Sequence, residues 1–156
     1  MLSFYPESLL NKAEIDETEF RRIVVRPMQS VQAIAALEKL VARINAHDPS
    51  GIIALCTADH VFTDSLGSTL SGRERLKEAW AGYFSLFPDY RIEVESTVAQ
   101  DTLVLACGFA SATHAASQKT WRIPAAWRAR VADGHIAEWQ VYADNKPVYE
   151  LLSQEA

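Results

Sequence analysis

The sequence predicts an α+β domain in which a curved sheet wraps around a long helix. Apart from a short closing helix, helical periodicity lies in the first half of the chain, up to Pro88, and strand-like alternation dominates the second half. The predicted order is three helices with one early strand, then an antiparallel meander. A chain of 156 residues fits one domain with a real core. We assign residues 29–156 to this domain and residues 1–28 to an N-terminal arm.

The first helix is expected to run from Ser30 to about Ala46. Ser30 suits the N-cap position, and apolar residues follow it at helical spacing. They form one stripe: Val31, Ile34, Leu37, Leu40, Val41 and Ile44. Residues 1–28, punctuated by Pro6 and Pro27, are expected to be irregular and to pack on the domain or on a partner subunit.

A short second helix is expected after Asp48-Pro49, since Asp48 is a good N-cap and proline suits the first helical position. The strand predicted at residues 59–63 then delivers Asp64 into a Ser-Leu-Gly turn. Asp64 is the most informative residue of the chain, because a carboxylate among apolar neighbours is either an acid/base group or a turn cap.

The third helix is expected over residues 72–87, with Ser71 as its cap, Glu74 as the capping-box partner and Pro88 as its stop. Strands follow at residues 90–98, 103–112, 121–131 and 136–142, with Asp133-Gly134 in a hairpin turn. Asp144 is expected to cap a closing helix over residues 147–152.

Composition excludes several classes of protein. Hydrophobic residues make up 49% and charged residues 22%, and the net charge is -5, which argues against non-specific binding to nucleic acid or to anionic lipid. No window approaches the ~20 apolar residues of a membrane span. Acidic residues stand where a signal peptide would be apolar, so we expect a cytoplasmic protein. Cys56 and Cys107 are expected to be buried free thiols, and no metal site is indicated.

Several segments resemble the nuclear transport factor 2-like superfamily, and more closely its SnoaL-like polyketide cyclase and ketosteroid isomerase branch. They are Ala42 to Asp48, Val61-Phe62-Thr63-Asp64 running into Gly67, Phe87-Pro88-Asp89-Tyr90, and Asp133 to Trp139. The similarity covers about residues 30–153. It implies a cone-shaped, cystatin-like α+β barrel with a deep apolar pocket, often dimeric through the outer face of the sheet.

Only some of the functional residues of the related enzymes have counterparts in this chain. Asp64 falls where steroid isomerases place their general base, but Leu40 and Ala126 stand where those enzymes place their oxyanion-hole donors. Epoxide hydrolases of this superfamily carry an aspartate two residues after the equivalent of Trp139, where this chain has Val141. Steroid isomerisation and epoxide hydrolysis are therefore disfavoured.

Two histidines are candidate partners for Asp64. His60 shares a strand face with Phe62 and Asp64 by the period of two, and could lie deep in the pocket as a donor. His114 ends a strand near the expected cone mouth. For each, the alternative is a buried structural histidine.

The expected pocket wall consists of apolar and aromatic residues that bind substrate or, alternatively, only fill the core: Phe62, Trp80, Tyr83, Trp139 and Val141.

The strand at 121–131 leaves its orientation open. Trp121 and Trp127 share one face, while Arg122, Ala126 and Arg128 share the other. If Ala126 occupies the inward-facing position that the resemblance gives it, the arginines also face inward, and Arg122 or Arg128 could bind a carboxylate or enolate. The alternative is that the tryptophans fill the core and the arginines lie outside.

The sequence supports two hypotheses. The first is a cofactor-independent enzyme that transfers a proton on a hydrophobic carbonyl compound, in isomerisation, cyclisation or dehydration. Asp64 is then the base or acid, with His114 or His60 beside it. The second is a ligand-binding or assembly module without catalysis, favoured by the missing donors at Leu40 and Ala126. We expect a hydrophobic small-molecule partner and a homodimer formed through the outer sheet face.

Overall fold

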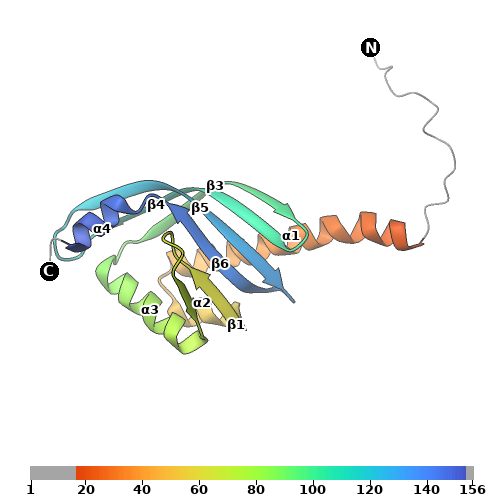
Figure 1. Cartoon of the computed structure of the whole chain (residues 1–156), viewed down its shortest axis with the longest axis horizontal. Coiled ribbons are helices and arrows are strands. Elements are labelled where there is room, and N and C mark those ends of the chain that lie inside the picture. Colours follow the sequence, from red (N-terminus) through yellow and green to blue (C-terminus); the bar gives the residue numbers. More distant parts are fainter. Residues whose placement is uncertain (1–16, 154–156) are drawn as a thin grey trace, which may run out of the picture.

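The computed structural model describes residues 17–153, with side chains from residue 28 onward. It is the expected α+β fold: a curved, unclosed sheet of six strands with a long helix across one side (Figure 1). The helices are α1 (Glu17–Asn45), α2 (Pro49–Ala54), α3 (Arg73–Leu86) and α4 (Lys146–Ser153). The strands are β1 (Cys56–Thr63), β2 (Thr69–Ser71), β3 (Arg91–Gln100), β4 (Leu103–Thr113), β5 (Thr120–Ala132) and β6 (His135–Ala143).

Helix α1 begins earlier than expected. It runs through Pro27 and Ser30, so the predicted N-cap at Ser30 is wrong. Proline lacks a backbone donor but has a helical φ, so it weakens a helix without excluding one. Residues 1–16 of the expected arm lie outside the described residues. No helix in the described part of the chain combines the length and apolarity that a membrane span needs.

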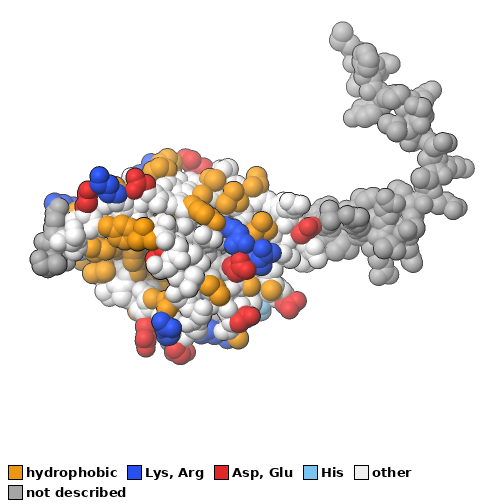
Figure 2. Space-filling view, viewed as in Figure 1, with side chains coloured by type: hydrophobic (Ala, Val, Ile, Leu, Met, Phe, Trp, Pro, Cys, Tyr) orange, Lys and Arg blue, Asp and Glu red, His pale blue; other side chains and the backbone are white. Residues whose placement is uncertain are grey.

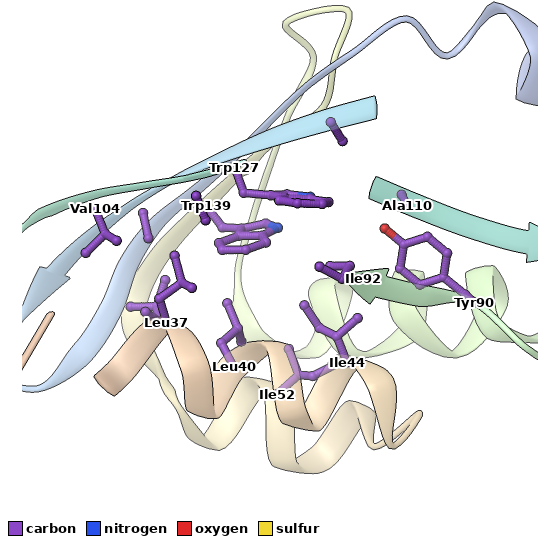
Figure 3. Packing of buried hydrophobic residues seen from close by; sticks show 14 of the residues in the cluster. Leu37, Leu40, Ile44, Ile52, Tyr90, Ile92, Val104, Ala110, Trp127 and Trp139 are labelled. Atoms are coloured by element: carbon purple, nitrogen blue, oxygen red, sulfur yellow. The ribbon is translucent and has the colours of Figure 1, made fainter. Parts of the chain in front are cut away.

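The inner side of α1 packs against the sheet and confirms the predicted apolar stripe in its central part. Figure 3 shows Leu37, Leu40 and Ile44 pointing from the helix toward the sheet, where Trp127 and Trp139 lie. All five side chains are buried in one hydrophobic cluster. Val31, by contrast, is exposed, because the first turns of α1 extend beyond the sheet (Figure 1).

The short helix α2 is capped as predicted, since the Asp48 carboxylate accepts a hydrogen bond from the Gly51 N–H at 2.8 Å. The cap of α3 was predicted wrongly. Ser71 belongs to β2, and Gly72 takes the N-cap position without a side-chain hydrogen bond. Gly72 has a φ of 95°, a conformation that favours glycine, so the chain turns sharply from strand to helix there.

The sheet has the order β2-β1-β6-β5-β4-β3. Strands β3 to β6 form the predicted antiparallel meander, and the turn before β6 has positive φ at both Asp133 and Gly134, as the Asp-Gly pair predicts. Strand β1 pairs in parallel with β6, which the sequence did not predict. A parallel pair needs a long crossover, and α3 with the meander supplies it.

The two faces of β5 settle the orientation that the sequence left open. Trp121, Ile123 and Trp127 are buried, and Trp127 is 0% exposed. Arg122 and Arg128 lie on the opposite, outer face, so the alternative in which the arginines face inward, and with it the predicted inward role of Arg122, is wrong. Burying an aromatic face gains far more free energy than burying guanidinium groups, which would need partners in the core.

The outer face also carries Cys107, which pairs with Ala126 in the sheet register and is exposed. The expectation that both cysteines are buried therefore holds for Cys56 alone. Cys107 lies in an apolar run whose alternate residues face outward, and composition alone does not distinguish the two faces of such a strand.

Candidate functional site

A cavity of about 190 Å³ opens between α3, the end of β1, and strands β5 and β6. It exceeds the roughly 150 Å³ of an engineered apolar cavity that holds benzene. Figure 2 shows apolar side chains on the surface between α3 and α4, on the left of the view. The cavity is lined by Phe62, Asp64, Ser65, Leu76, Ala79, Trp80, Tyr83, Tyr90, Trp127, Trp139, Val141 and Asn145.

The wall of the cavity is largely aromatic. The rings of Trp127 and Trp139 stack (Figure 3), and their centroids are 6.5 Å apart. Trp80 meets Tyr83 edge to face, with a centroid distance of 6.2 Å. All five residues predicted to form the wall line this cavity: Phe62, Trp80, Tyr83, Trp139 and Val141. Their role in binding a ligand stays a prediction.

Asp64 lies at the cavity and also holds its turn together. Its Oδ1 accepts hydrogen bonds from the backbone N–H groups of Leu66 at 2.9 Å and Ser68 at 2.8 Å. No described residue donates a hydrogen bond to Oδ2. The turn-cap alternative drawn from the sequence therefore holds for Oδ1. The acid/base role stays a prediction, for which Oδ2 is available beside the cavity.

Two phenols line the same cavity. Tyr83 and Tyr90 meet edge to face at 5.0 Å, and Figure 3 shows the Tyr90 hydroxyl pointing toward Trp127. Burial raises the pKa of both phenols well above their usual range. Both therefore stay protonated and can donate a hydrogen bond at neutral pH. Sequence reasoning missed Tyr90, although it lies in the Phe-Pro-Asp-Tyr segment that carries the family resemblance.

His60 borders a second, much smaller cavity of about 10 Å³ behind the aromatic wall. The ring is 3% exposed, and its Nδ1 lies 2.8 Å from the Ile136 carbonyl oxygen. Burial lowers the pKa of this imidazole, against smaller opposing effects of that carbonyl and of Asp59. The small cavity shares Phe62, Leu76, Trp80 and Trp139 with the larger one, so the two adjoin.

Two predicted site residues lie elsewhere. His114 is buried, with Nδ1 2.9 Å from the Ser117 hydroxyl oxygen, and it lines neither cavity. Arg122 lies on the outer face, where it pairs with Glu93 at 3.2 Å and stacks over the Phe109 ring. Among the described side chains, no group of three or more His, Cys, Asp or Glu is arranged to hold a metal ion.

Asn145, which the sequence did not single out as a site residue, lines the cavity and joins two segments at its edge. Its Nδ2 donates a hydrogen bond to the Ser65 hydroxyl oxygen at 2.9 Å. This bond joins the residue before α4 to the turn that carries Asp64. A contact between positions so distant in the chain leaves no local signal in the sequence.

The family model of the SnoaL-like domain matches residues 37–139. A comparison with curated proteins gives no match.

Solved structures share the fold. AclR, a proposed hydroxylase from Streptomyces galilaeus, is 23% identical, with a TM-score of 0.68 over 80% of this chain and 98% of its own. A proposed SnoaL-like polyketide cyclase from Jannaschia is 15% identical, with a TM-score of 0.71 over 77% of this chain and 90% of its own. An epoxide hydrolase of M. tuberculosis is 18% identical, with a TM-score of 0.67 over 80% and 90%. At such identities the likeness establishes the fold alone, and these proteins differ in their chemistry.

Proposed function

This chain belongs to the SnoaL-like domain family, and from its cavity we propose that it catalyses proton transfer on a hydrophobic carbonyl compound. The observation that carries the proposal is the meeting of a carboxylate and two neutral phenols in one aromatic cavity. These are the parts that proton abstraction next to a carbonyl requires: a base, and donors for the oxygen that gains negative charge.

The reaction begins with the Asp64 carboxylate. Oδ1 is fixed by two backbone N–H groups, and this leaves Oδ2 to accept a proton from the carbon next to the substrate carbonyl. The C–H electron pair forms a carbon–carbon double bond while the carbonyl π electrons move onto the oxygen, which gives an enolate. The proton on Asp64 then returns to another carbon in isomerisation, to the alkoxide formed by ring closure, or to a departing hydroxide in dehydration.

Tyr83 and Tyr90 are proposed as donors to the enolate oxygen. The donor positions of steroid isomerases are Leu40 and Ala126 in this chain, and Ala126 lies on the outer face of the sheet. Phenols on α3 and just before β3 take over this role from a different wall of the cavity. Losing one such donor costs about 2.7–4 kcal/mol of transition-state stabilisation in a studied oxyanion hole.

The substitution Asp64→Asn tests the base. Asparagine keeps the oxygen that caps the turn and removes the basic carboxylate. With 2-tetralone as the probe in deuterated water, the wild-type protein should accelerate deuterium incorporation next to the carbonyl, measured by proton NMR. Asp64→Asn should lower this rate about 10²–10⁴-fold, the typical contribution of a positioned base.

The matched control is Asp144→Asn, which makes the same chemical change at an aspartate outside the cavity. There the carboxylate accepts a hydrogen bond from the Lys146 backbone N–H. It should leave the exchange rate unchanged. Equal rates for wild type and Asp64→Asn would remove Asp64 as the base. Tyr83→Phe and Tyr90→Phe, tested in the same assay, report whether the phenols contribute.

The second candidate is a ligand-binding module without catalysis. It is favoured by the two hydrogen bonds to Oδ1, since these give Asp64 a structural reason to be an aspartate. In that case 2-tetralone binds in the cavity without faster exchange, and Asp64→Asn changes neither binding nor folding.

We also propose that two copies pair through the outer sheet face. Val98, Leu105 and Tyr142 are exposed there, with Cys107 and Ala126 between them in the register. Exposed apolar residues on one continuous face are typical of protein interfaces.

A further inference from the structure

The small cavity behind the aromatic wall has no place in the proton transfer described above. We propose that it is a subsite for a hydroxyl group at the inner end of the ligand, and that Nε2 of His60 accepts the hydrogen bond from this hydroxyl. The inference rests on the proposed function in one respect, namely that the larger cavity holds a ligand.

The hydrogen bond to Ile136 decides what His60 offers. A carbonyl oxygen only accepts, so Nδ1 at 2.8 Å from it must carry the proton. Because burial also keeps the imidazole neutral, Nε2 carries a lone pair and no hydrogen. None of the described residues donates a hydrogen bond to Nε2. His60 as a whole is 3% exposed, so a donor for Nε2 must enter through the small cavity that this residue lines.

The surroundings of His60 do not supply that donor. The small cavity is otherwise lined by apolar and aromatic side chains and by Cys56, whose thiol donates to the Ile52 carbonyl oxygen at 3.3 Å. A buried acceptor without a partner is costly, so a water or a ligand group is expected to fill the space. A volume of about 10 Å³ admits one small group, such as a hydroxyl.

The geometry of β1 relates this subsite to Asp64. His60 and Phe62 share one face of β1, from the small cavity to the larger one, and Asp64 directly follows the last residue of this strand. At about 3.3 Å per residue, His60 and Asp64 are separated by at most about 13 Å of extended backbone. A flat ring system against Phe62 can therefore place a hydroxyl at His60 while its other end lies near Asp64.

The same lining selects against an anion. None of the residues that border the small cavity is Lys or Arg. A carboxylate in the place of the hydroxyl would lose its hydration beside the Nε2 lone pair, and no Lys or Arg on the lining would bind it; the nearby Arg73 guanidinium already donates to the Cys56 carbonyl oxygen. The subsite therefore favours a neutral hydroxyl over both a methyl group, which donates nothing, and a carboxylate.

Three probes of similar shape test this preference: 2-naphthol, 2-methylnaphthalene and 2-naphthoate, each measured by equilibrium dialysis. Wild-type protein should bind 2-naphthol roughly tenfold more tightly than 2-methylnaphthalene, the value of about one hydrogen bond, and 2-naphthoate should bind weakest. Equal affinity for 2-naphthol and 2-methylnaphthalene would contradict the hydroxyl subsite but not the proposed function. If none of the three probes bound, both the subsite and the proposed function would be contradicted.

The variant His60→Asn distinguishes the contributions of the two ring nitrogens. The asparagine amide can still donate to the Ile136 carbonyl oxygen, while the Nε2 acceptor is lost. The preference for 2-naphthol should disappear in this variant. It should persist in His135→Asn, the same change at an exposed histidine outside both cavities. A preference retained in folded His60→Asn would overturn the inference.

A second measurement does not depend on a variant. In wild-type protein carrying ¹⁵N-labelled histidine, the Nε2 resonance of His60 should move upfield when 2-naphthol binds and stay in place with 2-methylnaphthalene. An unchanged Nε2 resonance at saturating 2-naphthol would also overturn the inference. Neither readout involves turnover, so both are independent of whether Asp64 acts as a base.

Discussion

The two oxygens of the Asp64 carboxylate have different surroundings, so one residue can hold its turn and also serve the proposed reaction. Oδ1 accepts two backbone N–H bonds within the turn, while Oδ2 has no donor among the described residues. His60 has a similar division, since Nδ1 is committed to Ile136 and Nε2 is not. At both residues, one polar atom fixes the side chain and leaves the other available to a ligand.

Cys56 gives a prediction at the scale of a single residue. Burial raises its pKa from 9.0 to about 12, although Arg73 nearby opposes the effect. Thiol reagents attack the thiolate, and three pKa units mean about a thousandfold less thiolate at neutral pH. In the variant Cys107→Ser, Cys56 should therefore react with Ellman's reagent at least about a thousandfold more slowly in native protein than in urea. Comparable rates in the two conditions would mean that Cys56 is not buried as described.

At the scale of the element, the sheet is shaped by a β-bulge in β3, between Val94 and Ser96. Before the bulge, Ile92 faces the core, and after it Val98 faces outward with Leu105. Gly108 lies opposite the bulge, and a Cβ atom there would overlap the Glu93 carbonyl oxygen. The backbones of β3 and β4 approach each other so closely at this point that only glycine fits.

The substitution Gly108→Ala should consequently destabilise the protein by about 1–3 kcal/mol, because the sheet must shift to relieve the overlap. Gly82→Ala is the matched control within α3, where an added Cβ meets nothing within 4 Å. It should stabilise the helix by about 0.5–1 kcal/mol. Urea unfolding followed by circular dichroism measures both. If Gly108→Ala unfolded at the same urea concentration as the wild-type protein, the close approach of the Gly108 and Glu93 backbones would be contradicted.

At the scale of the whole molecule, the curved sheet separates two environments. Its concave side holds α1 and the cavity, with the tryptophans of β5 and β6. Its convex side carries ion pairs, such as Arg128 with Glu138 at 2.8 Å, around exposed apolar residues. The proposed function concerns the first side, and the proposed self-association concerns the second.

Leu105→Glu tests the proposed dimer. We expect wild-type protein to sediment as a dimer and Leu105→Glu to sediment as a monomer, because burying a carboxylate at an interface carries a large desolvation cost even beside Arg128, the cross-strand neighbour of Leu105. Leu86→Glu makes the same change at a leucine of α3 that is 41% exposed, against 39% for Leu105. It should remain dimeric. A monomeric wild-type protein would remove the proposed interface.

The sequence by itself determined the elements of this fold other than β2, the turn at Asp64 and the five predicted wall residues, because periodicity and turn chemistry act between residues close in the chain. The start of α1, the parallel pairing of β1 with β6 and the inward face of β5 depended on tertiary structure. Tertiary structure also placed Tyr90 in the same cavity as Asp64, placed His114 and Arg122 outside it, and put His60 in the small cavity behind the aromatic wall. A strand pattern specifies two faces, and only packing against the other elements decides which face becomes the cavity.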